Sequence, residues 1–268
     1  MLSVSFYIDW QFEEEFIGNL AKCISVNKAK SADSVIIHSM NIASYIQKRN
    51  SEVFRDSKFS SIKINLIPPS FSALDYGGGA CGSYTLFLAR LLKKIGFKTK
   101  IVELNVNGNP GGHIALGVET NNKLLLVDPF FNHAFLDSTG NLSDIHEVAN
   151  NWEKFYSKHL PSGYKPEYNY QAGWHYTNWN KWGLLSESCY KIGSFLLGKN
   201  KMDNFSMRYY LLGSNKFYSA YSFSGFLFLV SLVVAPMFKQ KKFSLYKTTP
   251  VRSINMEIAP LAIQQPNL

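Results

Sequence analysis

Cysteine is scarce in this chain of 268 residues. The three cysteines, Cys23, Cys81 and Cys189, are odd in number and far apart, which argues against a disulfide framework. No two of them have the spacing of a metal-ligand pair, so the sequence implies neither a metal site nor a cofactor. A cysteine in such a chain is either a packing residue or a reactive thiol.

Two further features are missing at the N-terminus, a basic region and a long apolar run, so we expect no secretory signal peptide.

Acidic residues are also few, because 19 Asp and Glu stand against 28 Lys and Arg, for a net charge of +9. The lysines alternate with apolar residues instead of forming a stripe, which predicts a solvated basic surface and no nucleic-acid site. Attraction to anionic lipid or to another acidic partner stays open.

Residues 217–238 form an uncharged run between Lys216 and Lys239. About 20 apolar residues span a bilayer, and Tyr218 and Tyr221 suit the membrane interface. The run is therefore either a membrane span or a buried core helix or strand pair. We expect a membrane-associated, single-pass protein whose preceding part faces the cytoplasm, although the lysines and arginines around the run do not fix its orientation.

Local patterns predict a helix followed by an antiparallel sheet. Apolar positions from Tyr84 to Ile95 share one helical face, and Gly96 follows as a stop, which predicts a helix over 80–95. Strands are expected over 97–106, 113–120 and 123–128, separated by turns at 107–112 and 121–122. The fold class expected is α+β.

Cys81 follows three glycines at the start of the predicted helix. The unpaired N–H groups of a helix N-terminus favour the thiolate form of a thiol, and the N–H of Cys81 itself is suited to stabilise an oxyanion. The glycines leave room for a substrate backbone. A small packing cysteine is the alternative for Cys81 taken alone.

The positions of His113 and Asp128 favour the reactive alternative. If residues 121–122 form a two-residue turn, Asp128 lies opposite Ala115, and His113 lies two residues along on the same face. Such diagonal neighbours can be bridged by two polar side chains. Ala115 and Gly117 share that face, and their small size predicts that the Cys81 helix docks there.

The motifs Gly79-Ala80-Cys81-Gly82-Ser83-Tyr84, Gly111-Gly112-His113-Ile114-Ala115 and Leu126-Val127-Asp128-Pro129 together resemble the transglutaminase-like superfamily. The resemblance covers about residues 35–135. It implies a papain-like core in which a Cys-bearing helix packs on an antiparallel sheet. It also implies Cys81 as nucleophile, His113 as base and Asp128 as orienting residue. The family often has an aromatic residue after the His, where this chain has Ile114 and Ala115.

The function expected is cysteine-dependent acyl transfer on amide bonds of a protein or peptide substrate, with hydrolysis by a peptidase or amidase favoured. We expect Tyr76, Gly79 and Gly112 to contact the substrate. The alternative is a non-catalytic, membrane-associated module of the same fold that serves binding or assembly. Asp75 and His133 are weaker candidates for the site.

Five regions are expected: a helical N-terminal part (1–70), the catalytic core (71–150), an aromatic-rich segment (151–215), the membrane segment (216–240) and a basic, polar tail (241–268). The aromatic-rich segment suits core packing, a peptide- or glycan-binding wall, or a membrane-facing surface.

Overall fold

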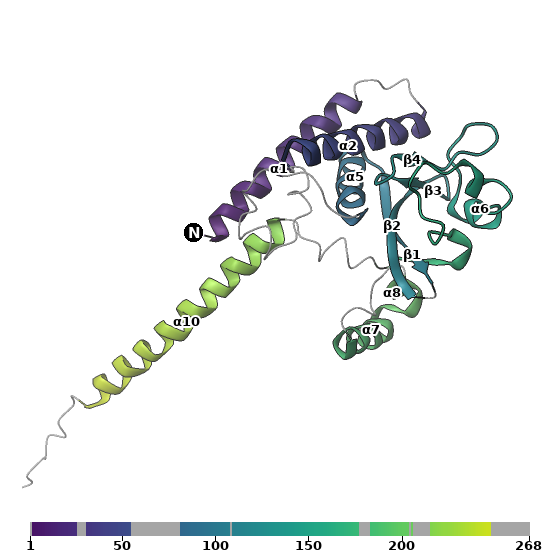
Figure 1. The fold of residues 1–268 in the computed structure, drawn as a ribbon. Coiled ribbons are helices and arrows are strands. Elements are labelled where there is room, and N and C mark those ends of the chain that lie inside the picture. Colours follow the sequence, from purple (N-terminus) through teal and green to yellow (C-terminus); the bar gives the residue numbers. More distant parts are fainter. Residues whose placement is uncertain are drawn as a thin grey trace, which may run out of the picture. The chain divides into compact units, whose positions relative to one another are not determined.

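The structure is a computed structural model that describes residues 2–25, 31–54, 81–107, 109–176, 183–203, 205 and 215–247. It divides into two compact units, Met1–Tyr221 and Ser222–Leu268. The first is a mixed unit of helices and one antiparallel sheet (Figure 1), which confirms the α+β class.

The sheet has the strand order β4-β3-β2-β1-β5, and every neighbouring pair is antiparallel. Its strands are β1 (Lys98–Val106), β2 (Asn109–Thr120), β3 (Lys123–Asp128), β4 (His133–Ala134) and β5 (Trp174–His175). Asn121 and Asn122 have φ values of 45° and 64°, and Thr120 pairs with Lys123. Asn tolerates this left-handed conformation better than most residues, so the predicted two-residue turn and its register are confirmed.

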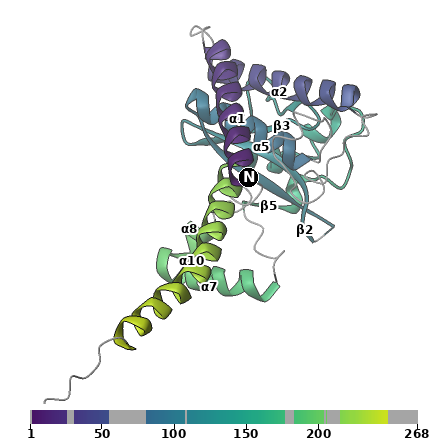
Figure 2. The same cartoon turned by 90° about the vertical axis from the view of Figure 1, so that its left-hand side faces the viewer.

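Three helices cover one face of the sheet: α1 (Leu2–Ser25), α2 (Ala32–Phe54) and α5 (Cys81–Ile95) (Figures 1 and 2). α5 ends as predicted, because Gly96 has φ of 112° and its N–H bonds back to Leu92. Leu88, Leu91 and Leu92 of α5 are fully buried against α1, α2 and the sheet. Arg90 also joins α5 to α1 through Glu13, at 2.7 Å.

The expectation for the docking face of α5 was wrong. The helix packs on the face that carries Leu116, Val118, Leu125 and Val127, whereas Ala115 lies on the opposite face. The large apolar residues match the apolar stripe of α5. The room above Ala115 and Gly117 is taken instead by Leu124 and by aromatic rings.

Those rings come from the segment after β4, which contains α6 (Ile145–Asn150) and the 3₁₀ turns η1 (Tyr156–His159) and η2 (Tyr170–Ala172). Trp152, Tyr156, Tyr164 and Tyr170 are buried with Val102, Leu104 and Leu126 on the second face. Of the three uses open to the aromatic-rich segment, these four residues serve core packing. Trp179 and Trp182 lie outside the described residues.

Helices α7 (Gly183–Leu197) and α8 (Lys199–Asp203) follow. α10 (Asn215–Lys247) is long and apolar enough over Tyr218–Ala235 to cross a membrane, and none of that window is buried. The helix continues past the expected membrane segment into residues 241–247. At its other end, Ser219 and Ser3 exchange two hydrogen bonds, at 3.0 and 3.1 Å, within the first unit.

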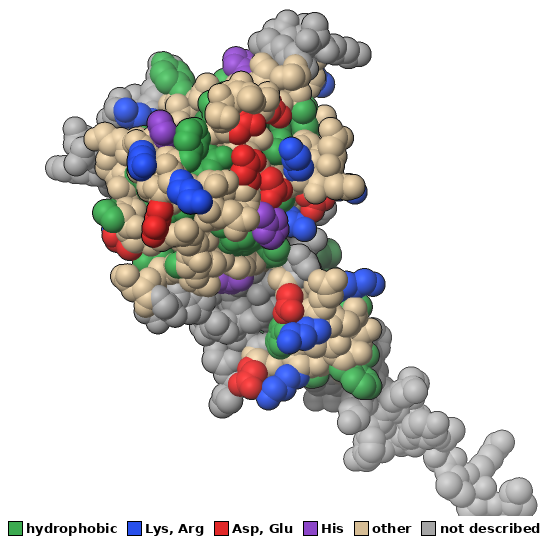
Figure 3. All heavy atoms as spheres, turned by 90° about the vertical axis from the view of Figure 1, so that its right-hand side faces the viewer, with side chains coloured by type: hydrophobic (Ala, Val, Ile, Leu, Met, Phe, Trp, Pro, Cys, Tyr) green, Lys and Arg blue, Asp and Glu red, His purple; other side chains and the backbone are tan. Residues whose placement is uncertain are grey.

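On the face of the molecule in Figure 3, several acidic side chains gather near the centre of the upper part, and basic side chains lie around them.

β2 begins earlier than predicted and contains a bulge directly before His113. Leu104 pairs with His113 but Asn105 pairs with Pro110, so Gly111 and Gly112 are inserted between two consecutive pairs. A Cβ on Gly112 would lie 2.6 Å from the Cβ of Val106, which leaves no room for a side chain. The bulge therefore depends on glycine at position 112.

We expect Gly112→Ala to destabilise the protein by about 1–3 kcal/mol, because the added methyl group overlaps Val106 and must displace a strand. Gly18→Ala is the matched control, since Gly18 lies inside α1 and a Cβ added there would enter open space. That change should stabilise the protein by about 0.5–1 kcal/mol. Thermal unfolding of the full chain in detergent would measure both, and equal melting temperatures for the two variants would contradict the steric argument.

Candidate active site

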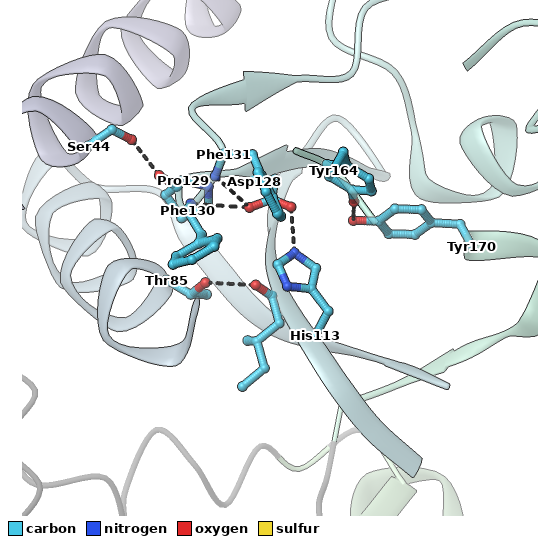
Figure 4. A network of polar contacts seen from close by, with 10 residues as sticks. Ser44, Thr85, His113, Asp128, Pro129, Phe130, Phe131, Tyr164 and Tyr170 are labelled. Atoms are coloured by element: carbon cyan, nitrogen blue, oxygen red, sulfur yellow. Dashed lines mark hydrogen bonds and ion pairs between the residues drawn. The ribbon is translucent and has the colours of Figure 1, made fainter. Parts of the chain in front are cut away.

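The carboxylate of Asp128 ends β3 and is completely buried. Its Oδ1 accepts hydrogen bonds from the backbone N–H groups of Phe130 and Phe131, at 3.1 and 3.3 Å (Figure 4). The hydroxyl of Ser44 on α2 donates to the carbonyl of Pro129 and fixes the same turn. The Asp-Pro turn thus orients Oδ2 toward β2 before any ligand binds.

His113 is 1% exposed and meets that carboxylate, with 2.5 Å between Nε2 and Oδ2 of Asp128. The predicted contact between the two residues is confirmed. Because Asp128 accepts from Nε2, the neutral imidazole carries its proton there and leaves Nδ1 as the base. Figure 4 shows Nδ1 on the side of the ring that faces α5.

Aromatic rings enclose the imidazole. Tyr168 stacks on it, with centroids 4.4 Å apart and planes at 12°. Phe131 and Tyr164 approach the same ring at 5.5 and 6.0 Å. The His113–Asp128 bond is therefore shielded from water, which strengthens it relative to the same bond at an exposed position.

Cys81 is the first residue of α5, and its partly buried side chain packs against Leu86, Ile101 and Ile114. One helical turn further, the Thr85 hydroxyl donates to the carbonyl of Ile114 at 3.1 Å. Ile114 directly follows His113, so this bond anchors the start of α5 beside the histidine. The three candidate residues thus come from the helix and two adjacent strands.

The electrostatics of His113 reflect both neighbours. Burial alone would lower the pKa of His113, but hydrogen bonds to Asp128 and Cys81 and their negative charges outweigh it and raise the pKa to about 9. At neutral pH the imidazolium form is therefore favoured. The Cys81 thiol lies close enough to act on the imidazole.

The site lies at the end of β3, where β2 extends beyond the last residue of its partner strand. β3 pairs with β2 from Leu116 to Thr120, and β2 extends beyond it toward Asn109. His113 is in this extension, on the face opposite α5 by register. Because β3 ends at Asp128, the imidazole can contact Asp128 on one side and the N-terminus of α5 on the other.

Two tyrosines near Asp128 were not expected from the sequence as site residues. The Tyr164 hydroxyl donates to that of Tyr170 at 3.5 Å (Figure 4). Burial, then the negative charges of Tyr170 and Asp128, hold the pKa of Tyr164 well above its usual value. Tyr164 is therefore a neutral hydroxyl beside the carboxylate. Its only sequence signal was the high aromatic content of the segment.

His133 pairs with Asp128 across β3 and β4, so it lies beside the site as the sequence suggested. Burial lowers its pKa, and the charge of Asp128 opposes that effect without cancelling it. His133 is thus neutral at pH 7 and is a neighbour of Asp128, with its ring packed on Phe135 at 4.6 Å.

Of the residues expected to contact substrate, Gly112 is exposed in the bulge next to His113. Tyr76 and Gly79, together with Asp75, lie outside the described residues, so their roles stay predictions. Within the described ranges, no group of three or more His, Cys, Asp or Glu side chains could hold a metal ion.

Comparison of the chain with protein-family models, with curated proteins and with solved structures finds no match.

Proposed function

We propose that the protein is a cysteine-dependent acyl-transfer enzyme that hydrolyses amide bonds, with Cys81, His113 and Asp128 as its catalytic residues. The observation that carries this proposal is the buried imidazole of His113, which interacts with a carboxylate through Nε2 and with a thiol at the start of a helix. A thiol with an oriented base beside it is the arrangement that nucleophilic catalysis requires.

In the proposed reaction, Cys81 and His113 form an ion pair in which Nδ1 holds the proton of the thiol, and the sulfur attacks the amide carbonyl carbon. The tetrahedral intermediate collapses when the C–N bond breaks, and the imidazolium delivers its proton to the leaving amine. Water, deprotonated by the neutral imidazole, then attacks the thioester and regenerates the thiol. Asp128 holds the tautomer throughout and stays ionised.

The raised pKa of His113, about 9, suits this role. An amine is a poor leaving group unless it is protonated, and an imidazolium at neutral pH holds the proton that it needs. The same positive charge attracts a negative charge on the neighbouring sulfur. The N–H groups in the first turn of α5 are suited to bind the oxyanion, since helix geometry gives them no partner within the helix.

The order of the three residues supports membership of the transglutaminase-like superfamily and a papain-like core. A nucleophile at a helix N-terminus, followed by a base and an orienting residue on adjacent antiparallel strands, is the pattern that the sequence resemblance implied. The proposed substrate is a protein or peptide. Hydrolysis is favoured over cross-linking because it needs no second substrate site.

We also propose that α10 anchors the enzyme in a membrane as a single span, with the catalytic unit on the cytoplasmic side. The length and apolar composition of Tyr218–Ala235 support the anchor. The anchor would restrict the enzyme to substrates near a bilayer.

We predict that limiting iodoacetamide at neutral pH labels Cys81 before Cys23 and Cys189. Cys23 and Cys189 are exposed whereas Cys81 is only partly so, and accessibility alone gives the opposite order. The thiolate is the reactive form of a thiol, and the imidazolium of His113 beside Cys81 favours that form. Peptide mass spectrometry would measure the three rates, and His113→Ala should remove the preference. Uniform labelling of the wild-type protein would refute it.

Turnover is the second test. A screen of fluorogenic peptide amides should find substrates whose hydrolysis is abolished by Cys81→Ala and unaffected by Cys189→Ala. Asp128→Asn should lower kcat by up to about 10⁴-fold, because an amide in place of the carboxylate favours the wrong tautomer. Wild-type rates in Cys81→Ala would overturn the mechanism. A reactive Cys81 without turnover of any amide would favour the non-catalytic binding module.

A further inference from the structure

One side of α7 exposes large apolar side chains. Phe195 is 89% exposed, Leu196 69% and Ile192 61%. In a helix with 3.6 residues per turn, these three lie on one side together with exposed Cys189. A soluble surface rarely leaves an apolar patch of this kind uncovered, so the patch indicates a binding face.

The other side of α7 is already occupied by α8. The Tyr190 hydroxyl donates to Asp203 at 2.6 Å, and a Cβ on Gly193 would lie 2.5 Å from the side chain of Met202. α8 therefore orients α7, and the apolar face points away from this contact.

The lysines near the face differ in their pairing. Lys191 is next to Phe195 but forms an ion pair with Glu187 at 2.7 Å, and Glu187 is about 180° around the helix from Leu196. Lys199 and Lys201 follow the end of the helix and are exposed. An apolar stripe followed by these two lysines matches the interface of a bilayer that carries anionic headgroups.

We propose that α7 lies on the surface of an anionic bilayer, with Ile192, Phe195 and Leu196 inserted among the headgroups. Residues 198–214 join Leu197 to α10, and because α8 within them is helical, this stretch reaches at most about 50 Å. A bilayer crossed by α10 is thus within reach of α7. This second membrane contact is independent of the thiol chemistry and would limit the orientations of the catalytic unit.

The test uses the full chain in vesicles. On a background of Cys23→Ser, Cys81→Ala and Cys189→Ser, Leu196→Cys is labelled with the environment-sensitive fluorophore NBD. Glu187→Cys, labelled in the same way, is the matched control on the opposite side of the same helix. Emission is recorded in phosphatidylcholine vesicles with and without phosphatidylserine, before and after addition of doxyl-labelled lipid.

The expected result is a blue shift at position 196 with phosphatidylserine present, and loss of intensity with doxyl lipid, while position 187 keeps its aqueous emission and intensity. Equal, unquenched emission at both positions would overturn the proposal. A blue shift at 196 without doxyl quenching, accompanied by energy transfer between labelled copies, would also overturn it and assign the face to a second copy of the chain.

Discussion

The buried charge of Asp128 is the constraint on which the site depends. A carboxylate removed from water costs several kcal/mol unless each oxygen is paired and hydrogen-bonded. Here Oδ1 accepts from the N–H groups of Phe130 and Phe131, and Oδ2 accepts from His113. The same requirement fixes three things at once: the turn after β3, the orientation of the imidazole and the tautomer that faces Cys81. Ser44, which holds Pro129 from α2, extends this constraint to the helical layer.

The sheet separates two layers with different tasks, and the site needs both. One layer consists of α1, α2 and α5 and positions the thiol, with Arg90 and the buried leucines of α5 fixing the helix. The other layer consists of aromatic residues that cover Asp128 and stack on His113. The imidazole can contact groups from both layers, because β3 ends at Asp128 while β2 continues. A dry environment for the carboxylate and an accessible thiol are therefore compatible in one small region.

The local features of this arrangement could be predicted from the sequence. Asn121 and Asn122 fixed the register that brings Asp128 to His113, and Gly96 fixed the end of α5. The predictions that were wrong concern features that depend on contacts between residues distant in the sequence. Small residues at Ala115 and Gly117 predicted the docking face of α5, but the larger residues on the other face suited the helix better. Tyr168 stacks on His113 although the two residues are far apart in the chain. Neither the spacing of apolar residues nor the residues of the turns could predict this contact. The glycine bulge was predicted as a turn because two adjacent glycines are typical of both.

If Cys81, His113 and Asp128 form one electrostatic unit, NMR titration of the His113 imidazole will reveal it. We expect a pKa of about 9 in the wild-type protein, because Asp128 and Cys81 outweigh the opposing effect of burial. We expect a lower pKa in Cys81→Ala, where one of the two partners is lost, and a still lower value when Asp128→Asn is added. The same pKa in the wild-type protein and in Cys81→Ala would show that the thiol does not interact with the imidazole and would contradict the account.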